Sequence, residues 1–290
     1  MDTASTSLSI SPSELAARLG RADAPVLLDV RPVPRFVQSD RLLAGARRCA
    51  PDDVARLAAT EPPREVVLYC VYGHEVSQEA AAALRRDGWN ARFLAGGIEG
   101  GEEGVDSPEA IALWRAAGLP LVRKRPDLGV TGERPSHWIT RERPKIDRIA
   151  CPWLVRRFID PTAVFHYVPT PQVLSEAARL GAVAYDIPGA LISHAWELCS
   201  FDALLRAFEL RSPALDALAT IIRGADTART ELAPQAAGLL AVSLGLSRLH
   251  ADDHAMLEAA IPVYDALFAW CRDVQDETHN WPHATAGSAQ

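Results

Sequence analysis

The sequence has few cysteines, and their arrangement does not indicate a disulfide framework. The five cysteines are odd in number, widely spaced and include no Cys-x-x-Cys pair. The chain does not open with a basic region followed by an apolar stretch, so we expect no secretory signal. Both absences favour a reducing compartment, and the sequence therefore predicts a cytoplasmic protein.

Excess positive charge and long apolar runs are also missing. Lys and Arg number 30 against 37 Asp and Glu, which gives a formal net charge of -7 at pH 7. A nucleic-acid-binding protein would show a basic footprint, so nucleic acid is not an expected partner. No apolar run is long enough to cross a bilayer, and we expect no membrane association. The chain does have 48% hydrophobic residues over 290 positions, which is enough for two buried cores.

Strand and helix patterns alternate through the first 120 residues. Short apolar runs that indicate buried strands are followed by segments with helical spacing, and glycine or proline separates many of them. This alternation predicts an α/β domain, in which a parallel sheet is covered by helices on both faces. The expected strands are 26–30, 66–70 and 91–94, and the expected helices are 11–19, 51–59, 77–87 and 107–118.

The most informative stretch leads into Cys70. An apolar run ends at this cysteine, and a glycine-containing turn and a helical segment follow. The order places Cys70 at the carboxyl end of a buried strand, where open α/β sheets bind their ligands. The N-terminus of the next helix favours anions and thiolates, so we predict a nucleophile rather than a buried structural thiol. The predicted active-site loop comprises Val71, Tyr72, Gly73, His74, Glu75, Val76 and Ser77, with the helix beginning near Ser77.

Three further residues of this region have predicted supporting roles. Asp29 and Arg31 lie at the end of an earlier strand, and we expect Arg31 to pair with a carboxylate rather than to touch a substrate. His74 is expected to line the pocket, because a thiolate at a helix N-terminus needs no general base.

Residues 10 to about 120 resemble a rhodanese domain. The resemblance implies a cysteine that takes sulfane sulfur from a small-molecule donor and passes it, as a persulfide, to a thiol or oxyanion acceptor. Backbone N–H groups and a helix dipole would hold both the thiolate and the persulfide. The motifs that carry the resemblance are Asp29-Val30-Arg31, Gly45-Ala46, the strand into Cys70 with its glycine loop, and Leu94-Ala95-Gly96-Gly97-Ile98.

The loop departs from that of related phosphatases, which bind phosphate with a Cys-x5-Arg motif. The sixth residue after Cys70 is Val76, so the guanidinium that would clamp phosphate is missing. The carboxylate of Glu75 would also repel an oxyanion. We therefore expect neither phosphatase activity nor a specific preference for thiosulfate.

The second half of the chain has a different pattern. A polar, arginine-rich stretch over 123–143 is predicted to be a linker between a first domain, 1–122, and a second, 144–290. The second domain is expected to be a mainly helical α+β domain. Its expected strands are 163–168 and 182–186, and its expected helices are 152–159, 173–180, 202–210, 213–223, 234–248 and 253–273.

This half, over about 140–290, looks like the C-terminal domain of the chromate-resistance family of the ChrB type. Family proteins named as regulators have a different N-terminal part, and here a rhodanese-like domain takes its place. The resemblance implies a link to chromate resistance without carrying over a DNA-binding role. The stretches that carry it are 143–160, Ser193-His194, Cys199-Ser200-Phe201, 223–227, 233–240 and 251–254.

Two sets of candidate residues lie in the second half, and each competes with an ordinary core or surface role. Lys145, Arg148 and Cys151 near a helix start could bind an oxyanion and offer a thiol, and Cys199 is a further thiol candidate. A metal ion is the one candidate cofactor, although no HExxH or CxxC motif supports it. The candidate ligands are His194, Glu197, Asp226 and His254. His194, Glu197 and Cys199 have the spacing of metal ligands on a turn, and His250 and His254 are four apart, so they share one helix face.

The leading hypothesis from the sequence is a rhodanese-type sulfurtransferase linked to chromate resistance. A second hypothesis is a sensor or regulator in which the second domain binds chromate or a metal and the first transmits a redox state. A third is a scaffold with an inactive rhodanese fold. The reactivity of Cys70 distinguishes the first hypothesis from the third.

Overall fold

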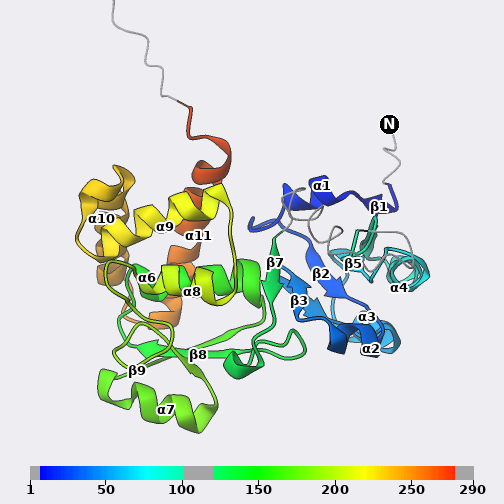
Figure 1. Cartoon of the computed structure of the whole chain (residues 1–290), viewed down its shortest axis with the longest axis horizontal. Helices are drawn as coiled ribbons and strands as arrows, with labels where there is room; N and C mark the ends of the chain where they lie inside the picture. Colours follow the sequence, from blue (N-terminus) through cyan, green and yellow to red (C-terminus); the bar gives the residue numbers. More distant parts are fainter. Residues whose placement is uncertain (1–6, 101–119, 278–290) are drawn as a thin grey trace, which may run out of the picture.

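A computed structural model of the chain describes residues 7–100 and 120–277 (Figure 1). Figure 1 shows an N-terminal half, blue to cyan, beside a larger half that runs from green to red. The expected fold class is confirmed, with a parallel sheet between helices in the first half and a mainly helical α+β second half. The helix expected over 107–118 lies outside the described residues.

The first half is built on a five-stranded sheet in which every pairing is parallel. The strand order is β1-β6-β5-β2-β4, so β5 lies at the centre. A central parallel strand is buried on both faces, which explains the continuous apolar run before Cys70. The strands are β1 (Ser9–Ile10), β2 (Val26–Asp29), β4 (Ala46–Arg48), β5 (Glu65–Tyr69) and β6 (Asn90–Leu94).

Two separate hydrophobic clusters cover the two faces of this sheet. Alternate side chains of a strand point to opposite faces. Val67 of β5 accordingly packs with Leu15 on one face, and Leu68 packs with Leu84 on the other. Ser11 caps the first helix in a capping box with Glu14. The helices of this half are α1 (Pro12–Ala16), α2 (Val33–Gln38), α3 (Val54–Thr60) and α4 (Glu75–Arg86).

The stretch expected to be a linker contains regular structure at both ends. Strand β7 (Leu121–Arg123) pairs antiparallel with β3 (Arg41–Leu43) of the first half. Strand β8 (His137–Arg141) is the central strand of the second half's sheet, and its residues Trp138 to Thr140 are buried. The boundaries of the two domains remain a prediction, but 137–141 is a core strand rather than solvated linker.

The second half combines a three-stranded parallel sheet with a helical core. The sheet has the order β10-β8-β9, and the helices α9 and α11 pack on each other beside α6. Helix α6 continues into a π-helical turn, Val155–Ile159. The remaining elements are α6 (Asp147–Leu154), β9 (Val164–Val168), α7 (Val173–Leu180), β10 (Val183–Ala184), α8 (Ser200–Ala207), α9 (Pro213–Asp226), α10 (Gln235–Leu249) and α11 (Asp253–Asp273).

Aromatic side chains fill the core of the second half, and backbone contacts join the halves. Trp153 of α6 packs on Phe268 of α11, with ring centroids 5.4 Å apart. The N–H of Gly45 donates to the carbonyl of Phe158 at 2.7 Å, which ties the first half to the end of the π-helical turn. No helix in the described part of the chain is both long and apolar enough to span a membrane.

Candidate functional site

Cys70 follows β5 directly, and its residue is 5% exposed. Helix α4 begins at Glu75, because the N–H groups of Ser77 and Gln78 donate to the carbonyl of His74 at 3.2 and 3.1 Å. The expected helix start near Ser77 is therefore two residues too late. The loop proper is 71–74, and the first turn of α4 contains the three residues after it, Glu75, Val76 and Ser77.

The hydroxyl of Ser77 lies beside the Cys70 thiol. The Cys70 Sγ and Ser77 Oγ atoms are 3.2 Å apart, and the Ser77 side chain is fully buried. The same hydroxyl is 3.2 Å from the carbonyl oxygen of His74. A hydroxyl has one hydrogen to donate, so it can turn from the carbonyl to a negatively charged sulfur when one forms. Ser77 thus gives the thiolate a buried hydrogen-bond donor.

A glycine turn holds the Cys70 loop in place from the other side. The N–H of Ile98 donates to the Cys70 carbonyl at 2.9 Å, and the N–H of Glu99 donates to the Val71 carbonyl at 2.9 Å. Gly97 has φ +59°, and a Cβ at this position would lie 2.3 Å from the Val71 oxygen. The two backbones approach so closely that only glycine fits. The loop conformation is therefore fixed by the 96–99 turn.

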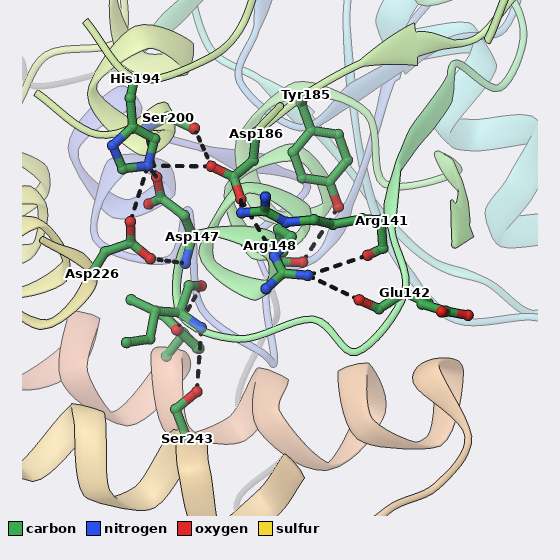
Figure 2. Close-up of polar contacts among 12 residues, drawn as sticks. Arg141, Glu142, Asp147, Arg148, Tyr185, Asp186, His194, Ser200, Asp226 and Ser243 are labelled. Atoms are coloured by element: carbon green, nitrogen blue, oxygen red, sulfur yellow. Dashed lines mark hydrogen bonds and ion pairs between the residues drawn. The ribbon is translucent and has the colours of Figure 1, made fainter. Parts of the chain in front are cut away.

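A second constellation of titratable side chains lies in the other half of the chain (Figure 2). Nε2 of His194 is 3.0 Å from Asp226 Oδ2, 3.2 Å from Asp186 Oδ1 and 3.5 Å from Asp147 Oδ2. Asp147 begins α6, Asp226 ends α9, and the other two residues lie in the segment between β10 and α8. We call these four residues the acid–histidine cluster.

Comparison with known protein families identifies both halves. Residues 11–103 match the family model of the rhodanese-like domain, and residues 138–271 match that of the ChrB C-terminal domain. The chain joins a rhodanese-like domain to a ChrB C-terminal domain. Both resemblances inferred from sequence are thereby confirmed.

Individual relatives cover only parts of the chain. Protein ChrB of Cupriavidus metallidurans is 34% identical over 132 residues, which are 45% of this chain and 39% of that protein. A rhodanese homologue from Thermus thermophilus is 30% identical and covers 31% of this chain and 96% of its own, with a TM-score of 0.26. A rhodanese-like domain protein from Staphylococcus aureus is 22% identical and covers 34% of this chain and 95% of its own, with a TM-score of 0.29.

In the rhodanese-like domain, Asp29 and Arg31 form a buried ion pair. Nε of Arg31 is 3.0 Å from both carboxylate oxygens of Asp29, and the two side chains are 0% and 1% exposed. The hydroxyl of Tyr69 donates to Asp29 Oδ2 at 3.0 Å, and Arg31 also donates to the carbonyl of Arg41 at 2.9 Å. Arg31 is thus paired with a carboxylate, as expected, and braces the strand ends.

The structure brings Arg35, which no sequence pattern singles out, to the Cys70 loop. Arg35 of α2 donates to the Tyr72 hydroxyl at 3.1 Å and lies 3.9 Å from the carboxylate of Glu99. His74 and Glu75 are exposed at the mouth of the loop. Arg35 is 35 positions before Cys70, and no local pattern links it to the loop, so only the fold reveals this cation.

In the ChrB C-terminal domain, two members of the expected oxyanion set of Lys145, Arg148 and Cys151 are held by other groups or buried. Arg148 is held by Asp186, with Nε 3.3 Å from Oδ2, and by the carbonyl of Glu142 at 2.9 Å. Cys151 is 2% exposed, and burial raises the pKa of its thiol well above the usual range. A protonated, enclosed thiol is a poor nucleophile, so Cys151 acts as a core residue.

Cys199 is also a core residue, at the start of α8. Its thiol donates to Asp202 Oδ2 at 3.3 Å, and its N–H donates to the same oxygen at 3.0 Å. Burial raises the pKa of the Cys199 thiol far above its ordinary value, and the nearby carboxylates of Asp147 and Asp202 add to this shift. Cys199 therefore stands at the N-cap position of α8, where the Asp202 carboxylate accepts from its backbone and its thiol.

Of the four expected metal ligands, the structure brings His194 and Asp226 together and leaves two apart. Glu197 is 81% exposed and pairs with Arg229 at 3.3 Å. His254 packs its ring on Tyr167, with centroids 5.3 Å apart. Sequence reasoning missed two members of the cluster. Asp147 was visible beside the candidate Arg148, but Asp186 follows a two-residue strand and has no motif around it.

Burial and mutual repulsion shape the electrostatics of the acid–histidine cluster. The pKa of the Asp147 carboxyl lies well above its usual range because of burial, and the neighbouring carboxyls of Asp226 and Asp186 raise it further. Burial and Asp186 also raise the pKa of Asp226, although His194 opposes the shift. The cluster concentrates acidic groups in a largely buried position where water screens them weakly, so it favours binding a proton or a cation.

Proposed function

We propose that the rhodanese-like domain is a sulfurtransferase in which Cys70 carries sulfur as a persulfide, in the service of chromate resistance. One observation carries the proposal. Cys70 follows the central strand, lies ahead of α4 and has the hydroxyl of Ser77 3.2 Å from its sulfur. The matching family supports the reaction class, and the ChrB C-terminal domain supports the link to chromate resistance.

The reaction has two displacements at sulfur. The Cys70 thiolate attacks the outer sulfur of a small-molecule donor, and the donor's S–S bond breaks with its electron pair on the leaving thiolate. The product is a Cys70 persulfide. An acceptor thiolate then attacks the outer sulfur of this persulfide and returns Cys70 as a thiolate. Cys70 is thus the covalent nucleophile of the first displacement and the leaving group of the second.

The surroundings of Cys70 suit a negatively charged sulfur. The N-terminal turn of α4 has N–H groups without helical partners, and these stabilise an anion together with the helix dipole. Ser77 adds a buried hydroxyl. A charge-assisted hydrogen bond of this kind contributes about 1.5–3 kcal/mol. These groups hold the thiolate before transfer and the persulfide after it.

The charges at the mouth of the loop bear on the choice of donor. Glu75 is exposed at the start of α4, and its carboxylate disfavours a doubly charged donor such as thiosulfate. A low-molecular-weight persulfide, with a thiol as acceptor, fits better, and an oxyanion acceptor is the alternative. All five cysteines are free thiols, so we place the reaction in the cytoplasm.

A sulfur-transfer assay with two cysteine variants tests this function. Cys70→Ser should abolish transfer from a persulfide donor to a thiol acceptor. Cys49→Ser is the matched control, because Cys49 is 6% exposed and packs in the same hydrophobic cluster. Burial raises the pKa of the Cys49 thiol, so it is expected to be inert. Equal activity of Cys70→Ser and the wild type would exclude the proposal.

The acid–histidine cluster favours a second function, in which the ChrB C-terminal domain senses a ligand. The cluster belongs to that domain and contains none of the residues around Cys70. A regulator of this kind should respond to its ligand even in Cys70→Ser. Titration of that variant with a divalent cation, followed by the fluorescence of core residues such as Trp153, should show a saturable change if the cluster binds the ion.

A further inference from the structure

Three side chains of the ChrB C-terminal domain, Asp147, Asp186 and His194, converge on one small volume, and Asp226 lies beside them with its Oδ2 3.0 Å from His194 Nε2. Figure 2 shows the carboxylates of Asp147, Asp186 and Asp226 turned toward the ring of His194. One oxygen from Asp147, one from Asp186 and one nitrogen from His194 all lie within 4.8 Å of one another. Asp147 and Asp186 are buried, while His194 is 39% exposed and Asp226 is 18% exposed. A small ligand can therefore reach the cluster past His194.

Hydrogen bonding within the chain satisfies these groups only in part: Asp186 Oδ1 accepts from the Ser200 hydroxyl at 2.8 Å, and Asp226 Oδ1 accepts from the N–H of Asp147 at 3.4 Å. Nε2 of His194 is the one nitrogen within 3.5 Å of three carboxylate oxygens, yet it carries at most one proton. Two of the three carboxylates therefore gain no hydrogen bond from it.

Asp147 gives independent evidence for a missing partner. Its residue is 0% exposed, and its Oδ2 accepts a hydrogen bond from the N–H of Ser200 at 2.5 Å. Its Oδ1 is buried and accepts no hydrogen bond of normal geometry from the described residues, although the Cys199 thiol lies nearby. A buried carboxylate oxygen without a hydrogen-bond partner destabilises the folded chain. We therefore infer that the carboxylate of Asp147 binds a ligand.

The cations of the chain neutralise only one of the three carboxylates. Arg141 and Arg148 both reach Asp186 Oδ2, each at 3.3 Å. Within residues 7–100 and 120–277, no Arg or Lys nitrogen forms an ion pair with Asp147 or Asp226. Among the described residues, His194 is the one basic side chain that pairs with Asp147 or Asp226. A doubly charged ion would balance them, whereas a single imidazolium would not.

The spacing of the ligand atoms fits a metal ion. Two ligands at right angles around a small divalent ion, each about 2.1 Å from it, are about 3 Å apart. The distances from His194 Nε2 to the three oxygens are 3.0, 3.2 and 3.5 Å. Carboxylates suit Mg²⁺ and Mn²⁺, and an imidazole adds preference for first-row transition metals.

We propose that Asp147, Asp186, His194 and Asp226 bind one divalent transition-metal ion, for which Mn²⁺ is the natural probe. The ion replaces the proton on His194 Nε2 and gives the buried carboxylates a shared positive partner. It ties the first residue of α6 to the last residue of α9 and to the segment before α8. Binding therefore stabilises the ChrB C-terminal domain, independently of sulfur transfer at Cys70.

The test uses the full chain, stripped of metal by EDTA and dialysis, and titrated with Mn²⁺. Loss of the free-ion electron paramagnetic resonance signal measures binding. We expect one tightly bound Mn²⁺ per chain and a rise in the midpoint of thermal unfolding. His194→Ala and Asp226→Asn should each weaken binding by more than about tenfold. Both side chains are partly exposed, so these variants are expected to fold.

Glu197→Gln is the matched control. Glu197 is three positions from His194 and acidic, but it points to Arg229 and not into the cluster. The control should bind Mn²⁺ as the wild type does. The proposal is overturned if the wild-type chain shows no saturable Mn²⁺ binding, or if both ligand variants bind as tightly as Glu197→Gln. Asp147→Asn, checked for folding by circular dichroism, should match the other ligand variants.

Discussion

The Sγ atom of Cys70 and the Oγ atom of Ser77 are 3.2 Å apart, inside a loop from which water is largely excluded. Ser77→Ala removes the side-chain donor that can turn toward a negatively charged sulfur. Losing a hydrogen bond to a charged group costs about 1.5–3 kcal/mol. We therefore expect sulfur transfer, and alkylation of Cys70 by iodoacetamide at neutral pH, to slow by about tenfold or more.

Ser175→Ala serves as the control for Ser77→Ala. Ser175 is exposed on α7, and its hydroxyl donates only to the carbonyl of Gln172. This variant should react like the wild type. If Ser77→Ala and Ser175→Ala are alkylated at the same rate, the hydroxyl does not stabilise the thiolate and its role is limited to packing.

Alanine substitutions at Gly97 and Gly129 distinguish the effect of a steric clash at the Cys70 loop from the effect of backbone strain. Both have positive φ, +59° and +66°, but a Cβ at Gly97 would lie 2.3 Å from the Val71 oxygen, whereas nothing lies within 4 Å at Gly129. Gly129→Ala should cost about 1 kcal/mol of unfolding free energy through strain alone. Gly97→Ala should cost about 3 kcal/mol or more and should lower sulfur transfer. Equal losses in urea denaturation would show that the 96–99 turn does not fix the loop.

The buried pair of Asp29 and Arg31 is predicted to stabilise the rhodanese-like domain. Asp29→Asn leaves the guanidinium of Arg31 buried without a counter-charge, and breaking such a pair costs about 3–5 kcal/mol. Asp23→Asn breaks the exposed pair with Arg21 and should change stability little. Unfolding in urea measures both. A small loss in Asp29→Asn would mean that Tyr69 and Arg41, rather than the ion pair, hold Arg31.

The environment of Lys124 should make the free energy of unfolding depend on pH in the alkaline range. Its ammonium group donates to the Phe36 carbonyl and lies 3.4 Å from the centre of the Phe36 ring. Burial, with a smaller contribution from Arg31, lowers the pKa of Lys124 to about 8. The unfolded chain, with the ordinary lysine pKa of about 10.4, therefore holds more protons above pH 8.

Stability should accordingly rise with pH between about 8 and 10.4 as the folded lysine loses its proton, and this contribution should be flat below pH 8. Lys124→Met removes the contribution. The urea midpoint of the wild type should rise across this pH range by more than that of Lys124→Met. Parallel pH profiles of the wild type and Lys124→Met would show that the pKa of Lys124 is not lowered in the folded chain.

Much of the fold could be predicted because its elements have strong local patterns. The apolar run before Cys70 and the alanine-rich helix after it identify a buried strand and its neighbour without tertiary information. The helix start was misplaced by two residues because His74 caps it through its carbonyl, with no capping side chain to mark the position. The core strand 137–141 was missed because arginines and prolines flank it closely.

The two candidate sites differ in how many of their residues could be predicted from the sequence. Cys70 and its loop are contiguous, so one stretch holds most of the site. The acid–histidine cluster is assembled from residues up to 79 positions apart, Asp147 to Asp226, and depends on how α6 meets α9. The spacing of His194 and Glu197 suggested a shared site, but the turn between them sends Glu197 toward Arg229.

Detection of a persulfide on Cys70 tests the central claim most directly. The purified full chain is treated with a low-molecular-weight persulfide, alkylated and digested with trypsin, which releases Cys70 as the one cysteine of the peptide 65–85. Mass spectrometry should show this peptide heavier by one sulfur atom, and a thiol acceptor should remove that sulfur. A peptide 65–85 that never gains sulfur, while the donor remains intact, would contradict the account.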